Sequence, residues 1–307
     1  MIQITEFKSL MDLLQKFSEE KICIEHLEAI RWNGNVVSPF DASSKVYKCA
    51  GFKYKCKNTG KYFNVRTGTI FEDTKVPLQK WFAAIYIVNS HKKGISSHQL
   101  AKDIAITQKS AWFLLHRIRY AFDHENFKKT FNDVVQADES FFGGKNKNRH
   151  ADKKVEKSQG RAHKDKTAVL GLLEYGHVSL TVIPNTQAET MRPIIKAQVA
   201  KGAILVSDEY DPYVWLRGHC FHVVVNHSHG QYVNGAFHTN SIEGFWSQFK
   251  RGVYGIYHSV SRKHLHRYCA EFAYRYNTRT AKDPARFNYC LTGIDKRLTY
   301  KELINNE

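Results

Sequence analysis

Two aspartates of this chain interrupt apolar stretches in a way that suggests catalysis. Asp138 follows Val134-Val-Gln-Ala, and Asp208 ends the run Ala203-Ile-Leu-Val-Ser. An ionised carboxylate is costly in apolar surroundings, and sites in open α/β sheets usually lie where strands end. A single aspartate at such a position can be a turn or helix-capping residue. Two in equivalent contexts favour a shared site.

A third carboxylate, Glu243, lies in a segment that we expect to be helical. Asn240, Glu243, Trp246 and Lys250 are spaced by three, three and four residues, which places them on one helix face. A carboxylate with an amide one turn before it and a lysine two turns after it suits a metal ligand beside a phosphate-binding cation. The same pattern also fits an ordinary amphipathic helix with Glu243 at its surface.

Converging carboxylates of this kind suit in-line phosphodiester chemistry. That chemistry must deprotonate a water or a 3′-hydroxyl and neutralise a pentavalent phosphate, and two Mg²⁺ ions can do both. Mg²⁺ prefers oxygen ligands. The carboxylates would repel one another until the cations bind.

These residues must be positioned by secondary structure, and the hydrophobic pattern of the chain changes from helical to strand-like near residue 133. We expect strands over 134–142, 167–173, 177–183, 203–208 and 221–225, and helices over 187–199, 239–250 and 262–277. This order predicts an α/β fold with mixed strand directions.

The preceding segment, from residue 77 to about 127, is predicted to be helical. Pro77 suits a helix start, and Thr107 can cap a helix whose apolar residues recur at helical spacing. The helices between Ser96 and Phe122 fit a helix-turn-helix, which would direct Gln108, Lys109 and Ser110 toward DNA bases or phosphates. A plain helical hairpin is the alternative.

The charge balance favours a polyanionic partner. Lysine and arginine number 46 against 29 acidic residues, for a formal net charge of +17. Nucleic acid is the first candidate and an anionic membrane surface the second. We expect no membrane association and no secretion, because no apolar run is long enough to span a bilayer and the start lacks a signal pattern. A cytoplasmic chain with six reduced cysteines is therefore expected.

A basic stretch, 145–166, separates the first two predicted strands. It holds nine lysines and arginines against three acidic residues. It is either a solvated loop or a loop that orders on DNA.

Several long strings resemble the DDE-type insertion-sequence transposases. They are Asp138-Glu-Ser-Phe-Phe-Gly-Gly-Lys, Ser207-Asp-Glu-Tyr, Val225-Asn-His-Ser and His238-Thr-Asn-Ser-Ile-Glu-Gly-Phe-Trp-Ser-Gln-Phe-Lys. The particular group is ISXO-like, with an N-terminal zinc ribbon, a helix-turn-helix and an RNase H-like catalytic domain. The resemblance covers about residues 20–280.

The resemblance implies a role for each candidate residue. Asp138 and Asp208 would bridge two Mg²⁺ ions, for which Mn²⁺ could substitute, and Glu243 would complete the triad. Asn240 is a second candidate ligand or a substrate contact. Lys250, together with Arg251, would hold a DNA phosphate near the cut end.

The resemblance also implies partners and an organisation. Double-stranded DNA, as terminal inverted repeats and as target, would be bound by a homodimer or higher oligomer in the nucleoid-containing cytoplasm. The expected parts are a degenerate ribbon-like region over 1–75, a helix-turn-helix domain over 76–130, an RNase H-like domain over 131–295 and a tail over 296–307.

The expected zinc ligands are mostly absent. The two motifs that should each carry a cysteine pair read Ser38-Pro-Phe-Asp and Cys56-Lys-Asn-Thr, so one of four thiolates remains. Cys23 and Cys49 match no usual spacing. We therefore expect a ribbon without zinc, held instead by aromatic residues: Trp32, Tyr47, Tyr54, Tyr62 and Phe63.

A second set of metal-ligand residue types, Cys220, His222, His227 and His229, does not suit zinc either. Positions 220 and 222 are alternate residues of a predicted strand. Packing, or a DNA contact by His227, explains them better.

Two other functional classes remain open. One is a DNA-binding regulator that has lost catalysis, against which the complete triad argues. The other is an RNase H-like nuclease acting on RNA hybrids or junctions, against which the predicted helix-turn-helix argues.

Overall fold

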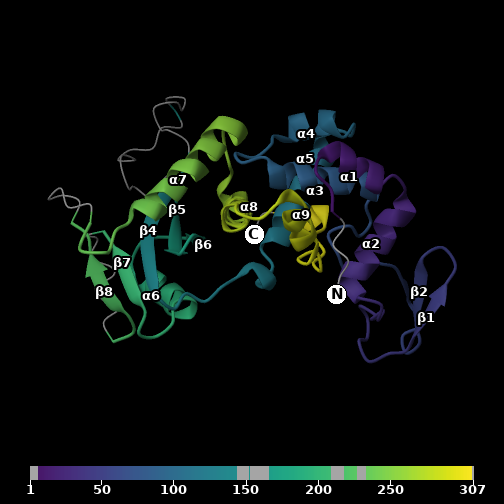
Figure 1. Ribbon diagram of the computed structural model, residues 1–307, viewed down its shortest axis with the longest axis horizontal. Coiled ribbons are helices and arrows are strands. Elements are labelled where there is room, and N and C mark those ends of the chain that lie inside the picture. The colour runs from purple at the N-terminus through teal and green to yellow at the C-terminus, as the bar shows by residue number, and fades with distance from the viewer. Residues whose placement is uncertain (1–5, 144–151, 153–165, 209–217, 227–232, 306–307) are drawn as a thin grey trace. The chain divides into compact units, whose positions relative to one another are not determined.

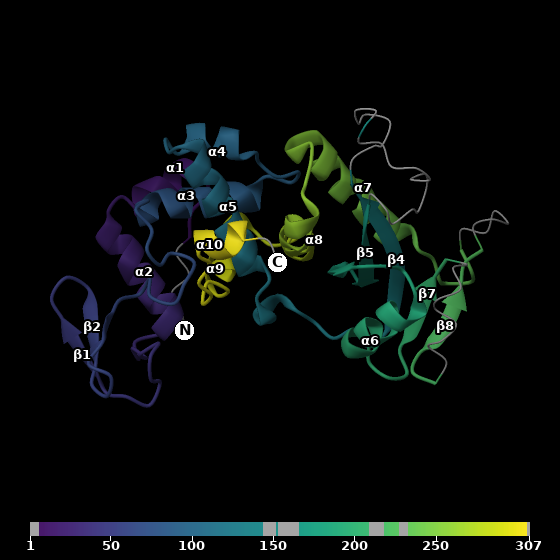
Figure 2. The same ribbon diagram turned by 180° about the vertical axis from the view of Figure 1, so that it is seen from behind.

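The computed structural model describes residues 6–143, 152, 166–208, 218–226 and 233–305. The chain forms two compact units, drawn in Figures 1 and 2. Unit 1 comprises residues 1–127 and 278–307, and unit 2 comprises residues 128–277. Nearly all of the basic stretch 145–166, together with His227 and His229, lies outside the described residues. No helix of the described residues is long and apolar enough to cross a membrane.

Unit 2 is built on one five-stranded sheet with the order β6-β5-β4-β7-β8. The strands are β4 (Val134–Phe142), β5 (Thr167–Glu174), β6 (His177–Ile183), β7 (Ile204–Ser207) and β8 (Phe221–Val224). Strands β4, β5 and β6 are antiparallel neighbours, whereas β7 runs parallel to both β4 and β8. The prediction of an α/β order with mixed strand directions is confirmed.

Helices cover both faces of this sheet. Helix α6 (Ala188–Gln198) packs through Met191 and Ile195 against one face. Helices α7 (Asn240–Gly252) and α8 (Leu265–Asn277) form an apolar layer on the other face. Because side chains of a strand alternate between faces, the nearly continuous burial of β5, an interior strand, shows that it is covered on both sides. Cys220 packs into the apolar layer of α6, and His222 Nε2 lies 2.8 Å from Ser207 Oγ.

Unit 1 is mainly helical. Its helices are α1 (Leu10–Lys16), α2 (Glu20–Trp32), α3 (Leu78–Ser90), α4 (Ser97–Asp103), α5 (Gln108–Phe122), α9 (Asp283–Leu291) and α10 (Tyr300–Ile304). Aromatic rings form much of its core: Phe287 of α9 lies 5.2 Å from Phe82 and 6.1 Å from Phe17 between ring centroids. Residues 278–295, which we expected within the catalytic domain, thus pack with the N-terminal part of the chain.

A small antiparallel sheet lies beside α2 in the N-terminal sequence. Its strands are β1 (Val46–Cys49), β2 (Lys53–Cys56) and β3 (Tyr62–Phe63). Trp32, Tyr54 and Phe63 are buried and their rings contact one another, as predicted. Tyr47 and Tyr62 do not belong to this cluster: they are 43% and 60% exposed. Their strand positions alternate with those of the buried residues, so they point to the other face.

The remaining thiol of the expected zinc motif is surrounded by hydroxyl groups. Cys56 is buried, and hydrogen bonds from Ser38, Ser44 and Thr59 lower its pKa to about 6. Asp41 accepts hydrogen bonds from Ser43 and from the Asn58 side chain. Hydrogen bonds thus join Cys56 to two of the other three motif positions, Ser38 and Thr59, whereas Asp41 bonds to Ser43 and Asn58.

Candidate active site

The parallel pairing of β4 and β7 brings the two aspartates together. Gln136 pairs with Val206 in this register. Continued by two residues, the same register sets Asp138 beside Asp208, on neighbouring strands that are about 4.8 Å apart. The charge of Asp208 acts on the Asp138 carboxyl group, in agreement with this placement. These residues are far apart in the sequence, and the sheet makes them neighbours.

Helix α7 contributes the third carboxylate, and its start is fixed to β4. The Gln136 side chain accepts a hydrogen bond from the backbone N–H of Ile242, at 3.0 Å. This N–H is one of those that a helix start leaves without an internal partner. Thr239, which precedes the helix, donates a hydrogen bond to Glu243 Oε1 at 2.8 Å. Both contacts hold Glu243 at the end of α7 that lies next to Asp138.

A glycine lets α7 approach the sheet closely. Gly171 of β5 pairs with Asp138 and lies under Trp246. A Cβ atom at Gly171 would be 2.6 Å from Trp246 Cζ2 and 3.1 Å from Ile242 Cδ1. Trp246 and Ile242 are both buried. The position of α7, and therefore of Glu243, depends on the absence of a side chain at residue 171.

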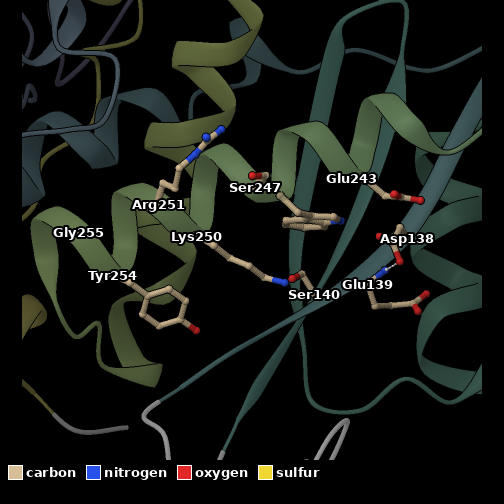
Figure 3. Close-up of a pocket in the computed structure, with 10 residues that line it drawn as sticks. Asp138, Glu139, Ser140, Glu243, Ser247, Lys250, Arg251, Tyr254 and Gly255 are labelled. Atoms are coloured by element: carbon tan, nitrogen blue, oxygen red, sulfur yellow. Dashed lines mark hydrogen bonds between the residues drawn. The ribbon is translucent and has the colours of Figure 1, made fainter.

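A pocket of about 740 Å³ opens between β4 and α7 (Figure 3). Carboxylates occupy one part of it and cations another, with Lys250 extending toward Ser140. The lining residues are Asp138, Glu139, Ser140, Glu243, Trp246, Ser247, Lys250, Arg251, Tyr254 and Gly255.

Asp138 is the electrostatic centre of this site. Burial, together with the negative charges of Asp208 and Glu243, raises the pKa of its carboxyl group to about 6. The backbone N–H of Glu139 and the charge of Lys250 act in the opposite direction. An ionised Asp138 therefore lacks sufficient positive charge nearby, which is the condition that a bound cation relieves.

The oxygen-rich composition of the site fits a hard divalent cation. Two buried polar atoms of the pocket wall, Ser140 Oγ and Trp246 Nε1, have no hydrogen-bond partner among the described residues, which suits a polar ligand. Within the described part of the chain, however, no three His, Cys, Asp or Glu side chains already converge as metal ligands. The residue types fit, and the carboxylates stand near one another without forming a closed coordination shell.

The structure brings together most of the residues predicted for this site. Lys250 and Arg251 line the pocket with Glu243. Asn240 does not: it is the first residue of α7, is exposed, and is absent from the pocket lining. Glu243 is exposed and lines the pocket.

Other residues of the site were not identified from the sequence. Gln136 lies two residues before Asp138, so strand alternation could have indicated that both face the same helix. Ser140 is the next residue on that face. Tyr254 lies beyond the end of α7, in a π-helical turn (Val253–Tyr257) that continues the helix along the pocket. Such turns are frequent at functional sites.

The predicted DNA-reading residues lie in unit 1, at the start of α5. Thr107 caps this helix by accepting a hydrogen bond from the Ser110 N–H, as predicted. Gln108 and Lys109 are exposed, whereas most of the remaining helix is buried. The Gln108 side chain donates a hydrogen bond to Ser97 of α4, and Lys109 Nζ lies 5.4 Å from the Tyr300 ring centroid. The fully exposed residues of α5 thus lie in its first turn.

Comparisons with known proteins agree with the resemblance to insertion-sequence transposases. Residues 130–277 match the family model of the ISXO2-like transposase domain. The chain is 27% identical over 277 residues to an uncharacterized protein in transposable element ISH50 of Halobacterium salinarum, covering 85% of this chain and 92% of that protein. It is 29% identical over 106 residues to an uncharacterized transposase-like protein of Haemophilus influenzae, covering 34% of this chain and 85% of that protein.

Among solved structures, a pre-cleavage Mos1 transpososome aligns with 95% of this chain and 94% of its own chain. The sequence identity is 11% and the TM-score is 0.19, so this likeness carries no argument about the fold. The family match rests on the sequence of unit 2. Residues 130–277 belong to the ISXO2-like transposase domain family.

Proposed function

We propose that this protein is the transposase of an insertion sequence, which cleaves the ends of its element and joins them to target DNA. The observation that carries the proposal is the position of Asp138. Its pKa is raised by burial and by the charges of Asp208 and Glu243, in a pocket that Lys250 enters from α7. The family match of residues 130–277 supports the same activity.

The three carboxylates would hold two Mg²⁺ ions, and Mn²⁺ would substitute. Bound cations would neutralise the repulsion around Asp138 and draw the carboxylates into a common shell. When bound, such ions activate the attacking oxygen and stabilise the charge that develops on the phosphate. Gln136 and Thr239 would act as positioning residues, because they fix the helix start and orient Glu243.

The cations at the other part of the pocket would bind the DNA strand. Lys250 and Arg251 lie in the last turn of α7, two turns after Glu243. A phosphate bound there would lie close to the carboxylates without touching them. Asn240 lies outside the pocket lining, so we assign it a substrate contact at the helix start rather than a metal ligand.

Unit 2 would be an RNase H-like domain, which its mixed sheet with helices on both faces supports. In unit 1, the small sheet would be a ribbon without zinc, and α3 to α5 would include a helix-turn-helix. The exposed first turn of α5 supports the latter assignment, with Gln108, Lys109 and Ser110 reading the terminal inverted repeats. The net charge of +17 would add salt-sensitive affinity for double-stranded DNA.

Each chain carries one set of the three carboxylates, whereas transposition joins two element ends. We therefore propose a homodimer or higher oligomer on DNA. Native mass spectrometry of the protein with end-containing duplexes would measure directly how many chains bind how many DNA ends. A complex with one chain and two ends would contradict this assembly.

A cleavage assay on duplexes that carry the element's own ends tests the activity. We expect strand cleavage in Mg²⁺ or Mn²⁺, and its loss in Asp138→Asn, Asp208→Asn and Glu243→Gln. Glu189→Gln is the matched control, because Glu189 is exposed on α6, across the sheet from the pocket. Normal DNA binding without cleavage by the unaltered protein would instead support a regulator. Preferential cleavage of RNA hybrids would support a nuclease.

A further inference from the structure

One face of the small N-terminal sheet combines lysines with exposed tyrosine rings. The β1–β2 and β2–β3 registers align Tyr47, Lys55 and Tyr62 in one row across the three strands. Lys53 lies on the same side of β2 by strand alternation, and Lys57, in the turn directly after β2, continues the β1–β2 register through its backbone hydrogen bond to Lys45. We call this surface, with Lys45, the lysine–tyrosine face.

The charges of this face are not balanced by acidic residues of the same segment. No aspartate or glutamate occurs between residues 42 and 71, which contain six lysines and one arginine. Lys57 donates its backbone N–H to the Lys45 carbonyl, so the two side chains occupy directly opposite positions. Like charges in such cross-strand pairs are destabilising. The pairing suits a surface that meets a polyanion.

The rings of the face are presented to solvent beside these lysines. Lys45 Nζ lies 5.5 Å from the Tyr47 ring centroid, and Lys55 Nζ lies 5.5 Å from that of Tyr62. A pocket of about 320 Å³, lined by Lys53, Tyr62, Phe63 and Asn64, adjoins the second ring. Tyr47 and Tyr62 stand two strand spacings apart, about 10 Å. Each ring can therefore receive a separate planar group.

We propose that the lysine–tyrosine face binds an unpaired DNA strand, with bases stacked on Tyr47 and Tyr62 and phosphates beside the lysines. Stacking rings combined with a basic surface are how proteins bind single strands without strong sequence preference. The choice of DNA rests on the proposed function, in which cleaved ends supply unpaired strands. Duplex DNA would use the lysines but leave both rings without stacking partners. An anionic membrane is a poorer fit, because the face carries no Trp, Leu or Ile.

Fluorescence anisotropy with a labelled oligothymidylate and the full-length chain tests this inference. Base stacking on an aromatic ring contributes roughly 5- to 150-fold in affinity per base. We expect Tyr47→Ala/Tyr62→Ala to weaken binding at least about tenfold, and Tyr47→Phe/Tyr62→Phe to retain it. Phe221→Ala is the matched control, because Phe221 is a 70% exposed ring in unit 2.

A charge variant provides an independent measurement. We expect Lys53→Ala/Lys57→Ala to reduce the slope of log affinity against log salt by about 1.4, since each lysine–phosphate contact to a single strand contributes about 0.7. This variant leaves the rings in place, so it answers the question even if the double tyrosine variant fails to fold.

Three outcomes would overturn the inference. The first is an unchanged oligothymidylate affinity in both Tyr47→Ala/Tyr62→Ala and Lys53→Ala/Lys57→Ala. The second is that Tyr47→Ala/Tyr62→Ala loses as much affinity for a duplex of the same length as for oligothymidylate. The third is stronger binding of the unaltered protein to phosphatidylserine vesicles than to DNA. Asp138→Asn separates this inference from the proposed function: it should abolish cleavage and leave oligothymidylate binding intact. If the unaltered protein bound oligothymidylate through this face but cleaved no DNA, the face would remain a DNA-binding surface and only the transposase assignment would fail.

Discussion

Adding one methyl group at Gly171 tests how α7 is positioned over the sheet. In Gly171→Ala the new Cβ would lie 2.6 Å from Trp246 Cζ2 and 3.1 Å from both Trp246 Cη2 and Ile242 Cδ1. Carbon atoms pack best at about 3.5–4.0 Å, so the helix must move away by about 1 Å. The indole cannot move aside alone, because Trp246 is only 4% exposed.

The expected effects follow from this displacement. Overpacking of a filled core costs about 1–3 kcal/mol of unfolding free energy. A shift of about 1 Å in catalytic groups costs on the order of 100-fold in rate. Gly171→Ala should therefore reduce single-turnover cleavage far more than it reduces DNA affinity, while the protein stays folded. Thermal melting and cleavage of an end-containing duplex measure the two effects.

Gly244→Ala is the matched control, since Gly244 belongs to α7 itself and a Cβ added there would meet no atom within 4 Å. It should keep activity and stabilise the helix by about 0.5–1 kcal/mol. Combining Trp246→Phe, which has a smaller ring, with Gly171→Ala should partly restore cleavage, because the effects of substitutions at two contacting residues are not independent. Wild-type melting and cleavage in Gly171→Ala would refute the close packing of α7 on β5.

Other predictions concern the helix start, a buried histidine and metal removal. Gln136→Ala should lower cleavage and cost about 0.5–2 kcal/mol as a lost helix cap, whereas Gln136→Glu, which keeps the acceptor for the Ile242 N–H, should retain more activity in the same assay. Burial lowers the pKa of His26, although its hydrogen bond with Asn288 opposes this. The unfolded state then binds more protons, so stability is complete above pH about 6.5 and falls as the pH decreases toward the folded pKa, by at most about 1.4 kcal/mol per pH unit. Between pH 5 and 7.5 the melting temperature of His26→Gln should depend less on pH than that of the unaltered protein. An identical pH dependence would show that His26 does not contribute to it. EDTA should abolish cleavage yet leave the melting temperature unchanged, because we expect no zinc at Cys56, the one cysteine left of the family's zinc motif, whose thiol is hydrogen-bonded to neighbouring hydroxyl groups; a large loss of stability on chelation would contradict a zinc-free sheet.

The strands and helices of unit 2 could be predicted because their periodicity is local. Asp138 and Asp208 could be identified because each interrupts an apolar run. Their adjacency could not, since it depends on the parallel pairing of β4 with β7, which joins residues about 70 positions apart. The contact between Gly171 and Trp246 depends in the same way on which helix covers β5.

The less successful predictions share a physical cause: a local sequence pattern does not specify which other part of the chain packs against that segment. Strand alternation separates Tyr47 from Tyr54 but does not say which ring faces Trp32. No glycine- or proline-rich linker marks residue 278, so the change from unit 2 to unit 1 has no compositional signal. It is the packing of Phe287 against Phe17 and Phe82 that assigns the last helices to unit 1.

The most direct test of the central claim is a metal-rescue measurement at the scissile phosphate. Sulfur replaces one non-bridging oxygen there, and single-turnover cleavage is measured in Mg²⁺ and in Mn²⁺. Because Mn²⁺ accepts sulfur more readily than Mg²⁺, the substituted DNA should be cleaved slowly in Mg²⁺ and recover in Mn²⁺. Asp208→Asn should show no recovery. Two results would contradict a metal held at the phosphate by Asp138, Asp208 and Glu243. One is the same ratio of the cleavage rate in Mn²⁺ to that in Mg²⁺ for the sulfur-substituted and the unsubstituted DNA, and the other is cleavage that continues in EDTA.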